Sequence, residues 1–303
     1  MKNMLFIINP FSGKVKIKSA LLDIIHMFNE AQFNVNVRTT LYQGHATELI
    51  ENVSDDTDIV VVSGGDGTLN EVITGLQKSG KKLPVGYIPT GSTNDFAATF
   101  GLSADPKTAA EEIVEGYPTP VDVGSFGKDR YFSYIASFGV FTAVSYNTSQ
   151  NFKNVFGHLA YVFEGIKDIA NITTYHVKVD ADDVTLEGEY IFGSVTNTTS
   201  VGGIVKFDTD MVKMNDGLFE IVLVKKPKNI NDLSQIITGL STSNFSGNSF
   251  EFIKSKNITM TFESDMDWSI DGEHEKTGSV VEISNIQTAV SIMKKRADED
   301  ADQ

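Results

Sequence analysis

The segment VVVSGGDGTLNEV at residues 60–72 has the residue types of a phosphate-binding loop. A β-branched run delivers the chain to Gly64, Gly65 and Gly67, and glycines let backbone N–H groups approach an anion closely. Thr68 is predicted to cap the helix that follows, whose N-terminus favours negative charge. A bound polyphosphate would repel Asp66 unless a divalent cation lay between them. Taken alone, Gly-Asp-Gly is also an ordinary turn.

Two more polar loops follow apolar runs in the first third of the chain. NPFSGK at residues 9–14 lacks the leading glycine of a Walker A motif, and alone it is typical of a turn. PTGSTNDFA at residues 89–97 places hydroxyls and an amide at the start of a helix, which alone indicates an N-cap. Because the carboxyl ends of parallel strands meet at one edge of a sheet, the three loops are expected to converge on one crevice.

The elements that position these loops are predicted from apolar periodicity. Expected strands at residues 4–8, 33–38, 59–62 and 85–88 alternate with expected helices at 17–28, 46–53, 68–76 and a last one through 98. The run at residues 59–62 is continuous, which suits a strand buried on both faces. The order predicts an open, Rossmann-like α/β sheet with right-handed crossovers.

Beyond residue 125 the pattern favours a mainly β domain, a sandwich or a bent sheet. Short alternating runs lie at residues 177–179, 190–195, 218–224, 258–262 and 280–283, with expected helices at 152–169 and 230–240. We therefore expect domains at residues 1–125 and 126–296, followed by an acidic tail at 297–303. Nothing between the halves resembles a flexible linker, so a tight pair of domains with a cleft is expected.

Composition excludes several classes of function. The 303 residues include 25 Lys plus Arg against 40 Asp plus Glu, a net charge of -15 that disfavours nucleic-acid binding. The absence of Cys excludes disulfides and thiolate metal sites, and makes a reduced cytoplasm the expected location. No apolar run approaches the roughly 18 residues of a membrane span. The five His show no ligand spacing, so no zinc is expected.

Together, and in this order, the three loops resemble those of the diacylglycerol kinase catalytic domain family, and the chain is similar over nearly its whole length to its soluble bacterial lipid kinases. The resemblance is carried by NPFSGK at 9–14, Gly44-His45-Ala46 after Thr40, GGDGTLNEV at 64–72, PTGSTNDFA at 89–97, VDVG at 121–124, NDGLFEI at 215–221 and DGE at 271–273. GGDGT alone is shared with NAD kinases, whereas the full set is specific to the family.

The resemblance implies an ATP-dependent lipid kinase with Mg²⁺, a nucleotide-binding first domain, and its active site in the interdomain cleft. Glu273 corresponds to the family's catalytic base, and a Mg²⁺ site corresponds to Lys213, Asp216 and Leu218, although many relatives have an acidic residue where Asn215 stands. Most relatives have Thr where Ser92 stands. The implied ATP contacts are Asn9, Ser12, Gly13, Thr40, Gly65, Asp66, Gly67, Thr68, Leu69, Asn70, Glu71 and Ser92.

Physical chemistry gives the acidic residues of this set complementary tasks. Phosphoryl transfer needs neutralisation of the γ-phosphate, an in-line hydroxyl and a group that accepts its proton. Asp66 is expected to hold Mg²⁺ against the phosphates, and Glu273 to meet the hydroxyl from the second domain. Asp271 is expected to orient that base or to contact the metal. Alone, Asp-Gly is a strong hairpin-turn signal.

The acceptor and the class of function leave alternatives open. Diacylglycerol is the favoured acceptor, while sphingoid bases, phosphatidylglycerol and polyprenols use similar machinery in related proteins. A kinase of the NAD kinase kind, acting on a soluble substrate, would share the GGDG loop. A catalytically inactive regulator that binds lipid or nucleotide would share the fold.

A lipid acceptor implies peripheral contact with a membrane surface. The hypothesis from sequence is that Lys14, Lys16 and Lys18 form a positive patch that offsets the repulsion between an acidic protein and anionic lipid. Three lysines on a first helix are also typical of a solvated face. The family resemblance further makes a homodimer an expectation.

Overall fold

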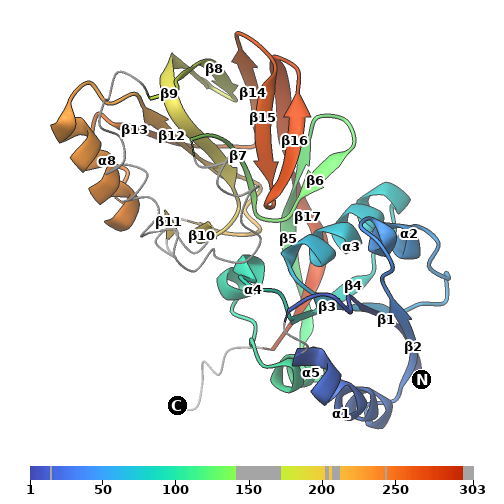
Figure 1. Cartoon of the computed structure of the whole chain (residues 1–303). Helices are drawn as coiled ribbons and strands as arrows, with labels where there is room; N and C mark the ends of the chain where they lie inside the picture. The colour runs from blue at the N-terminus through green and yellow to red at the C-terminus, as the bar shows by residue number, and fades with distance from the viewer. Residues whose placement is uncertain (14–15, 141–171, 202–204, 207–211, 243, 296–303) are drawn as a thin grey trace, which may run out of the picture. The chain divides into compact units, whose positions relative to one another are not determined.

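The computed structural model describes residues 1–13, 16–140, 172–201, 205–206, 212–242 and 244–295 (Figure 1). The chain forms two compact units, Met1–Val121 with Thr288–Gln303, and Asp122–Gln287. It leaves the first unit along β5 (Tyr117–Phe126) and returns along β17 (Val280–Lys294). The boundary expected near residue 125 falls within β5. The sequence did not predict that the chain returns to the first unit at Thr288. The predicted helix at 152–169 and the tail at 297–303 lie outside the described residues.

The first unit contains a parallel sheet, as predicted. Its strands are β1 (Lys2–Ile8), β2 (Phe33–Thr39), β3 (Ile59–Gly64) and β4 (Pro84–Pro89), in the order β4-β3-β1-β2. The end of β17 runs parallel to β4, with Ser291 opposite Pro84. Every residue of β3 is buried, which confirms that its continuous β-branched run is covered on both faces.

Helices cover both faces of this sheet (Figure 1). On one face, α1 (Lys16–Glu30) and α5 (Pro106–Glu115) pack over a cluster that includes Phe6, Val61 and Ile113. On the other face, α2 (His45–Glu51) packs against α3 (Asp66–Ser79), and the short α4 (Asp95–Phe100) follows β4. The apolar periodicity that predicts α1, α2 and α3 thus corresponds to their buried faces, whereas α5 was not predicted.

The second unit is mainly β structure, as predicted, and the structure shows antiparallel pairing between its strands. A path of paired strands runs β16-β15-β7-β9-β8-β14-β17, and β12 pairs with both β9 and β13. Its strands are β6 (Arg130–Phe132), β7 (Ile135–Gly139), β8 (Tyr175–Ala181), β9 (Val184–Thr196), β10 (Ser200–Val201), β11 (Val205–Lys206), β12 (Phe219–Lys225), β13 (Phe250–Ser255), β14 (Asn257–Phe262), β15 (Met266–Ile270) and β16 (Glu273–Thr277).

The core of the second unit is aromatic. The ring of Trp268, the single Trp of the chain, lies 5.1 Å from that of Phe138 and 5.0 Å from that of Phe126. Edge-to-face pairs of this kind give fixed packing geometry rather than a fluid interior. A second cluster lies beneath α8 (Ile230–Thr242), the helix predicted at 230–240, where Leu233 and Ile236 meet strands β9, β12 and β13.

Candidate functional site

The three polar loops of the first unit lie against one another, as predicted. The Asn9 side-chain N–H donates to Thr68 Oγ1 at 2.9 Å and joins the first loop to the start of α3. The Thr90 N–H donates to the Gly64 carbonyl at 2.8 Å and joins the third loop to the end of β3. The sheet edge thus brings Asn9, Ser12, Gly65 and Thr68 together as one group.

Glycines allow these loops to pack backbone against backbone. A Cβ on Gly91 would lie 2.6 Å from the Gly65 Cα, and a Cβ on Gly13 would lie 1.9 Å from the Thr90 carbonyl oxygen. Gly13 also has φ +58°, a backbone conformation that L side chains rarely adopt. The loops meet at Gly65, the N-cap of α3, and a helix N-terminus favours an anion.

Asp66 joins α3 to α4. Its side chain is buried, with Oδ2 accepting the Asp95 N–H at 3.0 Å and Oδ1 accepting the Phe96 N–H at 3.3 Å. Burial, and after it the charge of Asp95, raise the pKa of the Asp66 carboxyl to about 6. The observed role is to hold the third loop beside the second, and the contact with Mg²⁺ stays a prediction.

The remaining predicted ATP contacts fall into buried and accessible groups. Glu71 accepts the Gly44 N–H at 2.8 Å and the Ala46 N–H at 3.0 Å, so its carboxylate holds the start of α2. Thr40 is buried, and its N–H donates to the Ile8 carbonyl at 2.9 Å. Leu69 and Asn70 are buried on α3, whereas Ser92 is exposed. Thr68 lies inside the first turn of α3, which begins at Asp66, rather than at its cap.

In the second unit, Asp271 occupies the turn that its Asp-Gly signal predicts. Asp271 has φ +48° and Gly272 φ +84°, and Ile270 pairs with Glu273 across the hairpin. Asp271 Oδ2 accepts the Ser133 N–H and hydroxyl at 2.6 and 2.8 Å. Oδ1 accepts the N–H groups of Tyr134 and Ile135 at 3.1 and 3.0 Å. Burial raises the pKa of Asp271 to about 6 against the lowering effect of these bonds.

Glu273 is the first residue of β16 and is partly exposed. Its Oε2 forms an ion pair with the Arg130 guanidinium, which comes from β6. Arg130 Nε also lies 4.0 Å from an oxygen of Glu275. Asp271 therefore fixes the turn, and Arg130 fixes the side chain that follows it. Sequence reasoning did not find Arg130, because nothing in the chain marks a partner so far away in sequence.

The loop expected to bind metal has oxygen atoms available. The Met214 carbonyl accepts the Asp122 N–H at 2.8 Å, and the Asn215 carbonyl accepts the Gln287 side chain at 3.4 Å. No described residue donates to the carbonyls of Lys213 or Leu218. Asp216 Oδ1 accepts the Leu218 N–H at 3.1 Å. One carboxylate and two carbonyls suit Mg²⁺ completed by water.

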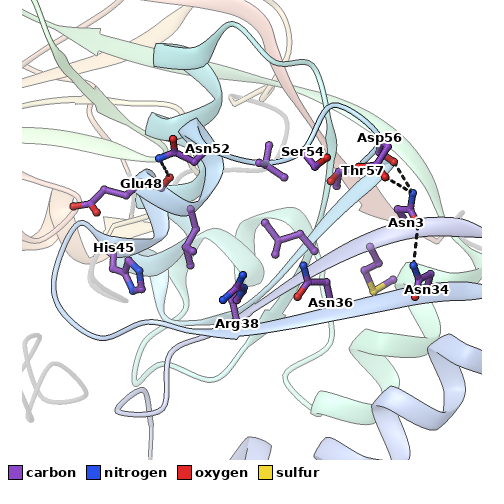
Figure 2. A pocket seen from close by; sticks show the side chains of 14 residues that line it. Asn3, Asn34, Asn36, Arg38, His45, Glu48, Asn52, Ser54, Asp56 and Thr57 are labelled. Carbon is purple, nitrogen blue, oxygen red and sulfur yellow. Dashed lines mark hydrogen bonds between the residues drawn. The ribbon is translucent and has the colours of Figure 1, made fainter.

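A cavity of about 460 Å³ in the first unit lies apart from the predicted contacts, since it is lined by none of them. It lies between the edge strand β2 and α2, and Arg38 and Asn36 point into it (Figure 2). Its other amides are engaged: Asn34 donates to Asn3 Oδ1 at 3.1 Å, and Asn52 donates to the Glu48 carbonyl at 2.9 Å. The groove is therefore a separate polar surface.

The described residues offer neither a side-chain metal cluster nor a membrane-spanning helix. No group of three or more His, Cys, Asp or Glu side chains there is arranged to hold a metal ion. No helix there has the length and apolar character needed to cross a membrane. Lys14 of the hypothesised basic patch lies outside the described residues, while Lys18 is exposed on α1.

Comparisons with known proteins cover both halves of the chain. The family model for the diacylglycerol kinase catalytic domain matches residues 3–126, and that for the YegS C-terminal NAD kinase beta sandwich-like domain matches residues 135–292.

A diacylglycerol kinase of Staphylococcus saprophyticus is 32% identical over 275 residues, covering 90% of this chain and 89% of the relative. A diacylglycerol kinase of Bacillus subtilis is 30% identical over 277 residues, covering 90% of each. A solved structure of a candidate diacylglycerol kinase from Bacillus anthracis has a TM-score of 0.82 at 27% identity, over 97% of this chain and 95% of that one.

Proposed function

The chain belongs to the diacylglycerol kinase catalytic domain family, and we propose that it transfers the γ-phosphoryl group of ATP to the free hydroxyl of diacylglycerol. The main support for this proposal is that the chain matches proteins named diacylglycerol kinase at 30–32% identity along about nine tenths of its length, which includes both halves. The lipid kinase assignment and its use of ATP follow from the family. Diacylglycerol as acceptor, Mg²⁺ as the metal and the roles of single residues are the proposal.

The loops of the first unit support a phosphate site. Asn9, Gly65 and Thr68 meet at the N-terminus of α3, where backbone N–H groups and the helix dipole favour the phosphates. Glu71 and Asp66 shape this site by holding α2 and α4 in place. The other proposed ATP contacts are Ser12, Gly13, Thr40, Gly67, Leu69, Asn70 and Ser92.

Glu273 is the proposed base. As the acceptor hydroxyl attacks the γ-phosphorus, its proton passes to the Glu273 carboxylate, the bond to the β-phosphate bridging oxygen breaks, and ADP leaves. Asp271 accepts hydrogen bonds from Ser133, Tyr134 and Ile135, so it acts as a positioning residue rather than as the base.

Mg²⁺ is proposed to bind at Lys213, Asp216 and Leu218, through two carbonyls and a carboxylate. When bound, the ion supplies positive charge that offsets the phosphates and stabilises this loop. The loop is already constrained, because the Asp122 carboxylate accepts the Gly217 N–H at 2.7 Å.

Peripheral membrane association and a homodimer complete the proposal. The acceptor lipid stays in a bilayer, so its hydroxyl is reached only from the bilayer surface. Vesicle sedimentation measures the first property, and sedimentation velocity measures the second.

The test is phosphoryl transfer from labelled ATP and Mg²⁺ to a panel of lipid alcohols in mixed micelles. The panel contains diacylglycerol, a sphingoid base, phosphatidylglycerol and a polyprenol, with NAD as a soluble acceptor. We expect label in the product from diacylglycerol, and loss of about 100-fold or more in Glu273→Gln. Preferred labelling of another acceptor would overturn the choice of substrate. Binding of ATP and lipid without transfer would favour an inactive regulator.

A further inference from the structure

Two short loops of the first unit expose large apolar side chains. Phe11, in the loop after β1, is 84% exposed, and Leu41, in the loop after β2, is 69% exposed. Tyr42 beside it is 54% exposed. Scattered apolar residues on a surface are normal, but a group of three large ones on neighbouring loops indicates an interaction surface. We call Phe11, Leu41 and Tyr42 the apolar rim.

The strand register places these loops next to each other. β1 and β2 are parallel neighbours, with Ile8 opposite Thr39, and the Thr40 N–H donates to the Ile8 carbonyl at 2.9 Å. The two loops therefore leave adjacent strands at the same edge of the sheet. The phosphate-binding loops begin at this edge too, since Asn9 contacts Thr68.

The backbone at Phe11 and at Leu41 is held by hydrogen bonds, so their exposure does not come from loose chain. The Phe11 N–H donates to Asn9 Oδ1 at 3.0 Å, and the same Asn9 side chain is tied to Thr68. The Leu41 N–H donates to His45 Nδ1 at 3.0 Å. The Tyr42 hydroxyl donates to Glu48 at 2.8 Å, and its ring stacks on that of His45. The backbone at Phe11 and Leu41 and the side chain of Tyr42 are therefore held in place before binding, which reduces the ordering that binding requires.

We propose that the apolar rim enters the surface of the bilayer that holds the acceptor lipid. The inference rests on the proposed function, because a lipid hydroxyl must come to the sheet edge that carries the phosphate loops. A purine ring is the rival occupant. A side chain in a preformed base slot has much of its surface covered by the slot, whereas 84% of Phe11 is free.

Charge supports apolar insertion over electrostatic attraction. The chain carries a net charge of -15, so anionic lipid repels it overall. Moving an apolar side chain from water into a lipid surface lowers the free energy, and this holds for a zwitterionic surface too. Salt does not screen this contribution. Binding through the rim is therefore expected on phosphatidylcholine and is expected to be insensitive to NaCl.

The experiment is sedimentation of the full chain with phosphatidylcholine vesicles that contain diacylglycerol. We expect Phe11→Ser with Leu41→Ser to weaken partition about tenfold or more. Leu22→Ser is the matched control, because Leu22 is 82% exposed on α1 and outside the rim. It is expected to bind as the wild type does. Equal binding by the double variant and the wild type would overturn the proposal.

Two further measurements separate the rim from the nucleotide site and from the proposed reaction. Calorimetric titration of ATP without vesicles is expected to give the same Kd for the double variant and the wild type. A raised Kd with unchanged vesicle binding would assign Phe11 and Leu41 to the purine. Vesicle partition needs no turnover, so it tests the rim even if labelled ATP shows that the acceptor is not diacylglycerol.

Discussion

At the residue scale, the proposed base is an ion-paired carboxylate. Arg130 contacts Glu273 and lies near Glu275, so one guanidinium separates two acidic side chains on β16. Such pairing restricts the rotamers of Glu273, and a base must be held within reach of the proton it accepts. If Glu273 is the base, Arg130 is expected to act on the reaction through it, as a positioning residue.

Replacing Arg130 is expected to lower turnover without affecting nucleotide binding. Arg130→Gln keeps a polar side chain but removes the ion pair, so we expect kcat to fall about tenfold with KM for ATP unchanged. Arg130→Lys retains the charge and is expected to recover part of kcat. Steady-state kinetics on diacylglycerol micelles measures both. Lys128→Gln, an exposed change on the same hairpin, is the control. A rise in KM for ATP with normal kcat would argue against this role.

Asp271 makes stability depend on pH. Burial raises its pKa in the fold to about 6 from 3.8, so the folded state binds the proton more tightly than the unfolded state does. The stabilisation from the protonated Asp271 carboxyl is present in full below its pKa in the unfolded state. It is lost as pH rises through its pKa in the folded state. From pH 5 to 7, linkage predicts that this group lowers the free energy of unfolding by about 1 kcal/mol.

Comparison with Asp271→Asn isolates this effect from the other acidic groups. Asn keeps one acceptor oxygen but turns an N–H₂ group toward N–H donors, so we expect a loss of about 2–4 kcal/mol at pH 5. The difference from the wild type is expected to shrink by about 1 kcal/mol at pH 7. Trp268, buried on β15, reports urea unfolding of this unit by fluorescence. A difference that grows with pH would contradict the assignment.

At the scale of elements, sequence periodicity finds those whose signals are local. The continuous run at 59–62 predicts β3, and the Asp-Gly turn predicts the hairpin between β15 and β16. Helix α5 was missed although its start carries a local signal: Asp105 accepts the N–H groups of Lys107 and Thr108, with Pro106 at the first helical position. Its buried face consists mostly of small residues, with Ala109 and Ala110 beside Ile113, so its apolar periodicity is weak in the sequence.

Contacts between distant elements could not be predicted. Glu71 holds α2 through Gly44 and Ala46, and Asp66 holds α4 through Asp95. Each side chain belongs to a motif that predicts ligand binding, and its observed bonds are structural. The spacing of a motif indicates which residues form the site. It does not indicate which backbone groups each carboxylate contacts, because those contacts depend on how the helices pack.

Backbone contact between the loops predicts a specific effect of Gly91→Ala. A Cβ there would lie 2.6 Å from the Gly65 Cα and 2.7 Å from Asn94 Oδ1, so the two loops must separate. We expect Kd for ATP to rise roughly tenfold by calorimetry, with the fold retained. Gly278→Ala is the control, because no atom lies within 4 Å of its Cβ position and its backbone is not left-handed. Equal effects of the two changes would show that loop contact does not set ATP affinity.

At the scale of the whole molecule, the first unit is discontinuous in sequence. Residues Thr288–Gln303 belong to it, and the end of β17 places Ile292 opposite Val85 on β4. Ile292 is fully buried, and Met293 lies in the same apolar cluster as Phe6 and Val61. A boundary drawn from composition alone, near residue 125, separates these residues from the core that they complete.

Cutting the chain at that boundary is therefore expected to leave an unstable first unit. A fragment of residues 1–125 exposes the edge of β4 and an incomplete core, and we expect it to aggregate or to lack cooperative thermal unfolding by circular dichroism. Residues 1–121 joined by a flexible Gly/Ser linker to residues 287–296 restore the strand, because β5 and β17 are paired neighbours. That version is expected to unfold cooperatively and to bind ATP. Cooperative unfolding of the 1–125 fragment alone would contradict this expectation. It would show that β1 to β4 and their helices are stable without the end of β17.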